Sequence, residues 1–292
     1  MCFFVQVKSD HAYSYQILEP QSSSAYRHPF LSVVRAAVCC ALALASTGVA
    51  ADWQSTLTKD PGTFPPLRPL HATYAFGWSG FSAATGEVHF TRPSEDHFQL
   101  DGTGRTTGLA RALWKLDATH YALADAETLR PIETKQTETY RWKNLITHLA
   151  FKNNGVKSER TEGATTKSRD FDFPGLLDLH SAMLFLRSQP LKERGVYRIV
   201  VYPATSAYLA TITVIGREKA SIRAGTYKAI KLDLKLNKIG KNLELEQHRK
   251  FRHGTIWVSD DADRMLLRIE AQIFVGTVFA ELQSVHYENP KS

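Results

Sequence analysis

Apolar and polar residues alternate along most of the chain after residue 70. Residues 230–236 place Ile or Leu at every second position between Lys and Asp, and residues 265–273 alternate in a similar way. A period of two is typical of a β-strand with one buried face. Comparable runs cover residues 72–78, 82–91, 96–106, 118–124, 131–140, 145–152, 196–202, 207–217, 246–258 and 276–287.

Turn-forming residues separate consecutive runs. They include Trp78-Ser79-Gly80, Asn153-Asn154-Gly155, Arg223-Ala224-Gly225 and Ser259-Asp260-Asp261. Short connections of this kind predict antiparallel hairpins in a meander. We therefore expect a mainly β protein with one curved antiparallel sheet of about ten or more strands, bent into a half-barrel or open barrel.

One segment has a helical period instead. Residues 176–188 repeat large apolar residues at helical spacing, Asp178 is a candidate N-cap, and Pro190 follows the predicted end. We expect this helix to pack on the concave face of the sheet, with Leu179 and Met183 against the core. A shorter helical turn is predicted at residues 108–113.

The mature chain reads as one domain. Four prolines in residues 51–70 predict a linker or strap. Residues 71–287 show no internal repeat or shift in composition, so they form a single β-rich domain, and residues 288–292 form a tail. The content of 43% hydrophobic and 22% charged residues is that of an ordinary folding sequence.

The first 50 residues carry an export signal. Arg35 precedes ten mostly apolar residues, and small residues follow up to Ala50 and Ala51. This pattern predicts a cleavable signal peptide cut after Ala50 or Ala51, and hence a periplasmic product. The run is shorter than the roughly 20 residues that span a bilayer, so no transmembrane anchor is expected after cleavage. Residues 1–30 are atypical of a signal peptide and indicate an over-extended start.

Composition excludes several classes of chemistry. The three cysteines are Cys2, Cys39 and Cys40, so the mature chain lacks disulfides, thiolate nucleophiles and cysteine-bound zinc. The net charge of +7 is spread along the chain, and an exported protein is not expected to bind nucleic acid. Attraction to an anionic lipid or another envelope component fits better. The sequence does not determine the oligomeric state.

Catalytic and cofactor motifs are absent from the sequence. Gly77-Trp78-Ser79-Gly80 lacks the spacing of a nucleophile elbow, and Gly102-Thr103-Gly104 lacks the rest of a dinucleotide fingerprint. The histidines never form His-x-His or His-Glu-x-x-His, so we predict no cofactor, no catalytic residue and no metal. Metal ligands distant in sequence remain an open alternative.

A series of motifs resembles the bacterial domain-of-unknown-function family 3108 over about residues 71–287. The matching segments, in the family's order, are Tyr74 to Trp78 with Gly86, Gly102 to Lys115, Leu129-Arg130-Pro131, Ser181 to Arg187, Ala224 to Tyr227 and Ile256 to Asp261. The resemblance implies exported envelope proteins with a strongly curved antiparallel sheet. It implies no activity or catalytic residues.

Three functions are compatible with these observations. The first is an envelope protein that binds a lipid or another apolar ligand, the second is a structural or scaffolding protein, and the third is a hydrolase assembled from distant Ser, His and Asp residues. For the first, large rings would shelter acyl chains and cations would meet an anionic head group. The candidate ligand-binding residues are Tyr74, Trp78, Phe81, Arg105, Arg111, Trp114, Phe185 and Trp257.

Overall fold

A single antiparallel sheet of fifteen strands dominates the computed structural model, which describes residues 52–274 and 276–288. The predicted signal peptide, both cleavage positions and residues 289–292 lie outside this part. The strands are β1 (Leu70–Trp78), β2 (Phe81–Ser94), β3 (His97–Thr106), β4 (Leu116–Asp125), β5 (Pro131–Tyr140), β6 (Asn144–Lys152), β7 (Gly155–Glu162), β8 (Thr165–Asp172), β9 (Val196–Val201), β10 (Tyr208–Ile222), β11 (Gly225–Ile239), β12 (Leu245–Gln247), β13 (Phe251–Ser259), β14 (Leu266–Ile273) and β15 (Gly276–Tyr287). The helical elements are η1 (Trp53–Thr56), α2 (Gly108–Leu113) and α3 (Leu179–Ser188).

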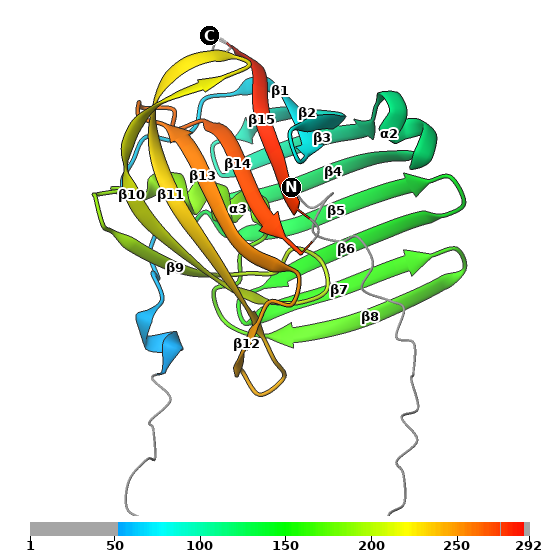
Figure 1. The fold of residues 1–292 in the computed structure, drawn as a ribbon. Helices are drawn as coiled ribbons and strands as arrows, with labels where there is room; N and C mark the ends of the chain where they lie inside the picture. Colours follow the sequence, from blue (N-terminus) through cyan, green and yellow to red (C-terminus); the bar gives the residue numbers. More distant parts are fainter. Residues whose placement is uncertain (1–51, 275, 289–292) are drawn as a thin grey trace, which may run out of the picture.

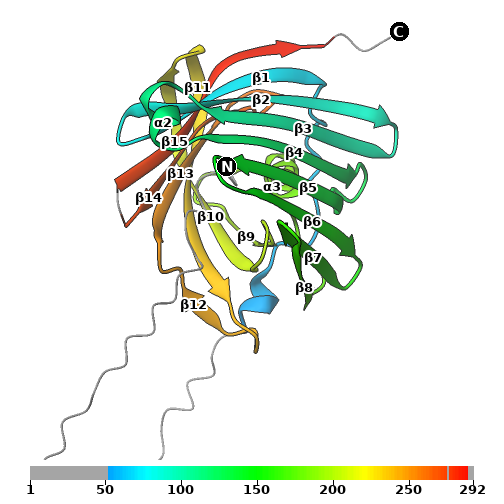
Figure 2. The ribbon, with the colours of Figure 1, turned by 90° about the vertical axis from the view of Figure 1, so that its right-hand side faces the viewer.

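Two meanders make up the sheet. Strands β1 to β8 follow one another, strands β9 to β15 form the second series, and pairing of β1 with β15 joins them. The outermost strands, β8 and β9, do not pair with each other, so the sheet curves without closing (Figures 1 and 2). The expected curved, open, mainly β architecture is therefore confirmed.

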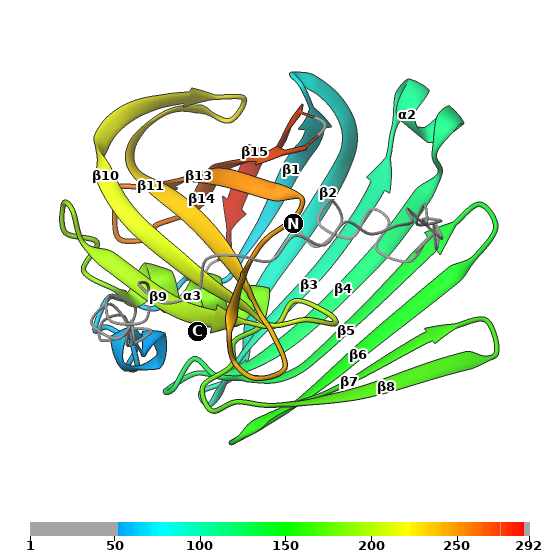
Figure 3. The same cartoon turned by 60° about the horizontal axis from the view of Figure 1, so that its bottom comes forward.

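Helix α3 connects the two meanders and lies on the concave side of the sheet (Figure 3). The carboxylate of Asp178 accepts the backbone N–H of Ser181 at 2.6 Å, which caps the helix as predicted. The helix begins three residues later than expected. Leu177 is extended and exchanges backbone hydrogen bonds with Val200 and Tyr202, so the preceding chain belongs to the edge of the sheet.

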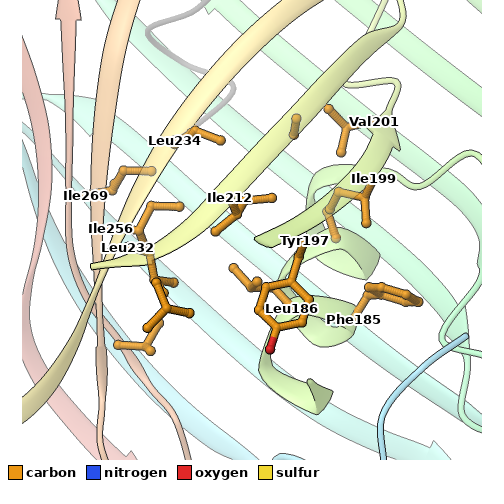
Figure 4. Packing of buried hydrophobic residues seen from close by; sticks show 14 of the residues in the cluster. Phe185, Leu186, Tyr197, Ile199, Val201, Ile212, Leu232, Leu234, Ile256 and Ile269 are labelled. Atoms are coloured by element: carbon orange, nitrogen blue, oxygen red, sulfur yellow. The ribbon is translucent and has the colours of Figure 1, made fainter. Parts of the chain in front are cut away.

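The main hydrophobic core lies between α3 and strands β9 to β11, β13 and β14. Figure 4 shows Phe185 and Leu186 of the helix together with Ile212, Leu232 and Ile256 of the sheet, and all five are buried. Met183 packs against this core as predicted, although both it and Leu179 are only half-buried. Their side chains border a cavity, which is described below.

Residues 52–68, here called the strap, pack against β9 and the end of α3. Thr58 donates its backbone N–H to Arg198 of β9 at 2.8 Å, and the Trp53 ring stacks on Phe173 with centroids 5.5 Å apart. A β-carbon at Gly62 would lie 2.0 Å from the carbonyl oxygen of Ser188, so this close approach requires glycine.

Candidate functional site

Two apolar cavities lie beneath α3. The wide chamber, of about 250 Å³, is bounded by Leu179, Ala182 and Leu186 of the helix and by Ile212, Leu234 and Ile256 of the sheet. The narrow chamber, of about 180 Å³, is bounded by Leu184 of the helix and by Leu70, Tyr74, Phe76 and Phe90 of strands β1 and β2.

Met183, Leu266 and Ile269 line both chambers and so form the partition between them. Met183 projects from α3, whereas the other two come from β14. An unbranched thioether side chain adopts many rotamers at little cost. Movement of Met183 is therefore the simplest way to join the two spaces.

One histidine faces the narrow chamber. The ring of His180 lies 5.7 Å from the ring of Phe90, and burial lowers the pKa of His180 to about 3. The imidazole is neutral at physiological pH as a result. Its Nε2 atom has no hydrogen-bond partner within residues 52–274 and 276–288. The Tyr74 hydroxyl, in contrast, donates to the carbonyl of Leu266 at 2.9 Å.

Two arginines line the narrow chamber. Burial lowers the pKa of Arg187 to about 10, which leaves its guanidinium charged at neutral pH. In the described hydrogen bonds this group donates only to the carbonyls of Pro65, Ala262 and Asp263. The carboxylate of Asp263 is bound at 2.6 Å by Arg68.

Arg264 has similar surroundings. It donates to the carbonyls of Arg187, Gln189 and Pro190, and the Phe64 ring lies 3.3 Å from its guanidinium carbon. The narrow chamber therefore combines apolar walls with two cations that are bound mainly by neutral carbonyl groups. Such a site favours an anion.

The structure divides the predicted ligand-binding residues among four places. Tyr74 lines the narrow chamber, and Phe185 packs in the core on the side of a groove beneath the strap. Trp257 is half-buried and donates its indole N–H to Glu218 at 2.7 Å. The other five gather at the end of the sheet that carries α2: Trp78, Phe81, Arg105, Arg111 and Trp114.

The arginines at the α2 end surround Asp117. Arg111 forms a bidentate pair with this carboxylate at 2.8 and 2.9 Å. The guanidinium lowers the pKa of Asp117, to which Arg105 and Lys115 add smaller effects. Asp117 thus already provides a directly bonded counter-ion for Arg111, whereas the carboxylates near the two arginines of the narrow chamber act on them without a described hydrogen bond.

Large apolar side chains are exposed at this same end, here called the hairpin end. Antiparallel pairing brings the β1–β2 turn, α2, the β5–β6 turn and the β14–β15 turn to the same end of the strands. Phe81, Leu113 and Trp142 are 78%, 79% and 86% exposed, respectively. Phe76 connects this end with the chambers, because it lines both the narrow chamber and a small void beside Trp114.

At the start of α3 the hydroxyl groups of Ser181 and Thr134 lie beside the carboxylate of Asp178, and Ser181 is the one that belongs to the helix. It is completely buried next to Asp178, and its hydroxyl has no described partner. A substrate cannot reach a nucleophile in this position. We therefore assign no catalytic role to Ser181.

The architecture is that of an open, barrel-like β protein with apolar chambers on its concave side. The chain belongs to the family described as "Protein of unknown function (DUF3108)", which matches residues 72–283. The resemblance found in the sequence is thus confirmed. None of the described helices is long and apolar enough to cross a membrane.

Three solved structures are similar to this chain at low sequence identity, and one of them has a TM-score above 0.5. A β-barrel-like protein of the DUF1849 family from Brucella abortus is 7% identical, with a TM-score of 0.52 over 77% of this chain and 100% of its own. A candidate exported protein with a YmcC-like fold from Bacteroides fragilis has 11% identity and a TM-score of 0.29, covering 77% of this chain and 99% of its own. A candidate lipoprotein from Parabacteroides distasonis has 8% identity and a TM-score of 0.33, covering 78% of this chain and 99% of its own. No curated protein matches the sequence.

Proposed function

We propose that this protein binds a single-chain anionic lipid, such as a fatty acid, in the two chambers beneath α3. The observation that carries the proposal is the pairing of adjoining apolar cavities with the guanidinium groups of Arg187 and Arg264. An acyl chain matches the aliphatic and aromatic walls. A carboxylate matches the two cations.

Each chamber alone is smaller than the roughly 300 Å³ at which ligand pockets usually begin. A long acyl chain would have to cross the partition, and Met183 is the part of that partition best able to move. The proposal therefore includes rotation of Met183 when the ligand enters. The head group would stay beside Arg187 while the tail reaches the wide chamber.

The hairpin end would provide contact with a membrane. Exposed aromatic and aliphatic side chains favour the boundary between lipid head groups and acyl chains, and nearby cations favour an anionic surface. Phe81 and Leu113 would enter that boundary, with Lys115 close to the phosphates. Together with the predicted signal peptide, this arrangement supports a periplasmic protein that takes up or delivers lipid at a membrane surface.

The scaffolding alternative requires no cavity and would leave Arg187 and Arg264 only the structural role of binding the carbonyls of the strap and of the end of α3. A test that separates the two functions measures binding of a fluorescent fatty acid to the full chain after removal of bound lipid, with oleate as the competitor. We expect saturable binding of one equivalent. Oleyl alcohol should compete at least about tenfold more weakly, because it lacks the carboxylate.

A pair of tryptophan variants locates the ligand. Met183→Trp fills the partition and should weaken oleate binding at least about tenfold, since little free volume remains beneath α3. Leu113→Trp adds the same ring at the exposed face of α2 and should bind oleate normally. Circular dichroism verifies that both variants are folded. Absence of binding to the wild type, or equal binding by both variants, would disprove the proposal.

A further inference from the structure

Three potential metal ligands meet on the surface where β1, β2 and β15 lie side by side. His71 of β1 is the cross-strand partner of His89 in β2, and on its other side it is the partner of His286 in β15. Cross-strand partners project from the same face of an antiparallel sheet. Glu288 follows β15 and is held next to β1 by a backbone hydrogen bond to Pro69 at 2.9 Å.

The side chains of His71, His89 and Glu288 converge. The Nε2 atoms of His71 and His89 lie 3.2 and 2.8 Å from the same carboxylate oxygen of Glu288. The two imidazole rings stack with centroids 3.8 Å apart, and the three ligand atoms all lie within 4.8 Å of one another. No Lys or Arg of the described residues forms an ion pair with Glu288.

These separations are close to those of a tetrahedral zinc site. Zinc bonds to imidazole nitrogen and carboxylate oxygen are about 2.0–2.2 Å long, which places neighbouring ligand atoms about 3.3–3.5 Å apart. Small side-chain rotations would therefore admit an ion between the three groups. The side chains of His71, His89 and Glu288 are 57%, 36% and 41% exposed, so an ion can reach them from solvent.

We propose that His71, His89 and Glu288 form a binding site for a divalent transition metal, with Zn²⁺ as the best match. Two imidazoles and one carboxylate suit this ion, and three protein ligands leave a fourth position for water or another donor. Bound metal would join the end of β15 to β1 and β2. The site is separate from the lipid chambers, so either proposal can fail without the other.

Isothermal titration with ZnCl₂ tests the site in an untagged full-length chain that carries Cys2→Ser, Cys39→Ser and Cys40→Ser, because thiolates would also bind zinc. We expect one saturable equivalent and a rise in Tm with zinc concentration. Co²⁺ in place of Zn²⁺ should give the visible absorption of a tetrahedral complex.

Ligand variants decide whether these residues are responsible. His89→Gln and Glu288→Gln should each weaken zinc binding at least about tenfold and abolish the rise in Tm. His253→Gln is the matched control, since His253 forms a comparable pair with Asp233 at 3.0 Å on another part of the surface. No saturable zinc binding, or full binding by His89→Gln and Glu288→Gln, would overturn the proposal.

Discussion

Two parts of the sheet, here called wings, pair in the same antiparallel way but differ in the polarity of a row of side chains on the concave side. In the wing formed by β10, β11, β13, β14 and β15, one row of cross-strand partners is entirely apolar: Val214, Leu232, Ile256, Ile269 and Ala280. In the wing formed by β3 to β7, a corresponding row is almost entirely polar: Gly102, His120, Gln136, Thr147 and Arg160.

This difference explains where an apolar ligand can bind. Antiparallel register determines which side chains are neighbours, whereas the residue types determine whether those neighbours exclude water. Helix α3 packs on the apolar wing, where the wide chamber lies, and the narrow chamber extends from there onto β1 and β2. The apolar residues of the polar wing, such as Leu149 and Val156, are already packed in a separate core with Phe173, so we expect the acyl chain beneath α3.

Truncation of a side chain in each row should give the largest difference in stability between the two wings. Leu232 is completely buried in the apolar row, so Leu232→Ala should lower the free energy of unfolding by about 2–5 kcal/mol. Thr147→Ala in the polar row should cost about 1 kcal/mol or less. Urea denaturation measures both. Equal losses would show that the two wings are packed alike.

Removal of the Asp178 side chain, which joins α3 to β5, should have the next largest effect on the free energy of unfolding. Asp178 caps α3 and also accepts the hydroxyl of Thr134 in β5 at 2.6 Å, so Asp178→Ala removes a cap and leaves a buried hydroxyl unpaired. We expect a loss of about 1–3 kcal/mol in urea denaturation.

Asp52→Ala is the control for this variant, because Asp52 caps the exposed helix η1 and should contribute about 0.5 kcal/mol or less. Asp178→Asn, which retains an acceptor oxygen, should recover part of the stability. If Asp178→Ala were as stable as Asp52→Ala, the carboxylate would not connect the wings.

The stability at low pH should reveal that His180 is buried in its neutral form. Its pKa of about 3 in the folded protein lies below the value of about 6.5 expected when unfolded, so the unfolded chain takes up a proton that the folded chain excludes. This contribution to stability should fall by about 1.4 kcal/mol per pH unit between about pH 6 and pH 4. Urea denaturation of the wild type and His180→Gln at several pH values measures it. Parallel pH profiles for the two proteins would contradict the buried, neutral histidine.

A further difference is expected between two neighbouring residues of α3. Leu184 is buried, and Leu184→Ala should cost about 2–5 kcal/mol in thermal or urea unfolding. Met183 is half-buried beside the chambers, so Met183→Ala should cost only about 1 kcal/mol. A loss for Met183→Ala as large as that for Leu184→Ala would show that the partition is tightly packed and not able to move.

Local sequence patterns predicted most strands because alternation and turn residues act over a few positions. They missed β7 and β8, whose residues are mainly polar and charged and so lack the alternation of a half-buried strand. The helix was predicted from its spacing. The cavity beside Met183 was not, because a void depends on how distant strands pack.

Local sequence patterns also did not predict the two proposed sites. Arg187 follows the helical pattern, but nothing near it in sequence indicates Arg264 as a neighbour on the narrow chamber. His71, His89 and Glu288 come from three chain segments and lack any short metal motif. Cross-strand register supplies the missing information, since it relates positions up to about 200 residues apart.

An open sheet has two unpaired edges, and unpaired edges can recruit strands from other molecules. The β9 edge is partly protected by the strap through the backbone bond between Thr58 and Arg198. The β8 edge carries Lys167, Arg169 and Asp170, whose charges disfavour pairing with a second copy. Proteolytic loss of the strap would therefore expose the backbone of β9 as a template for intermolecular β-sheet, with aggregation starting at that strand.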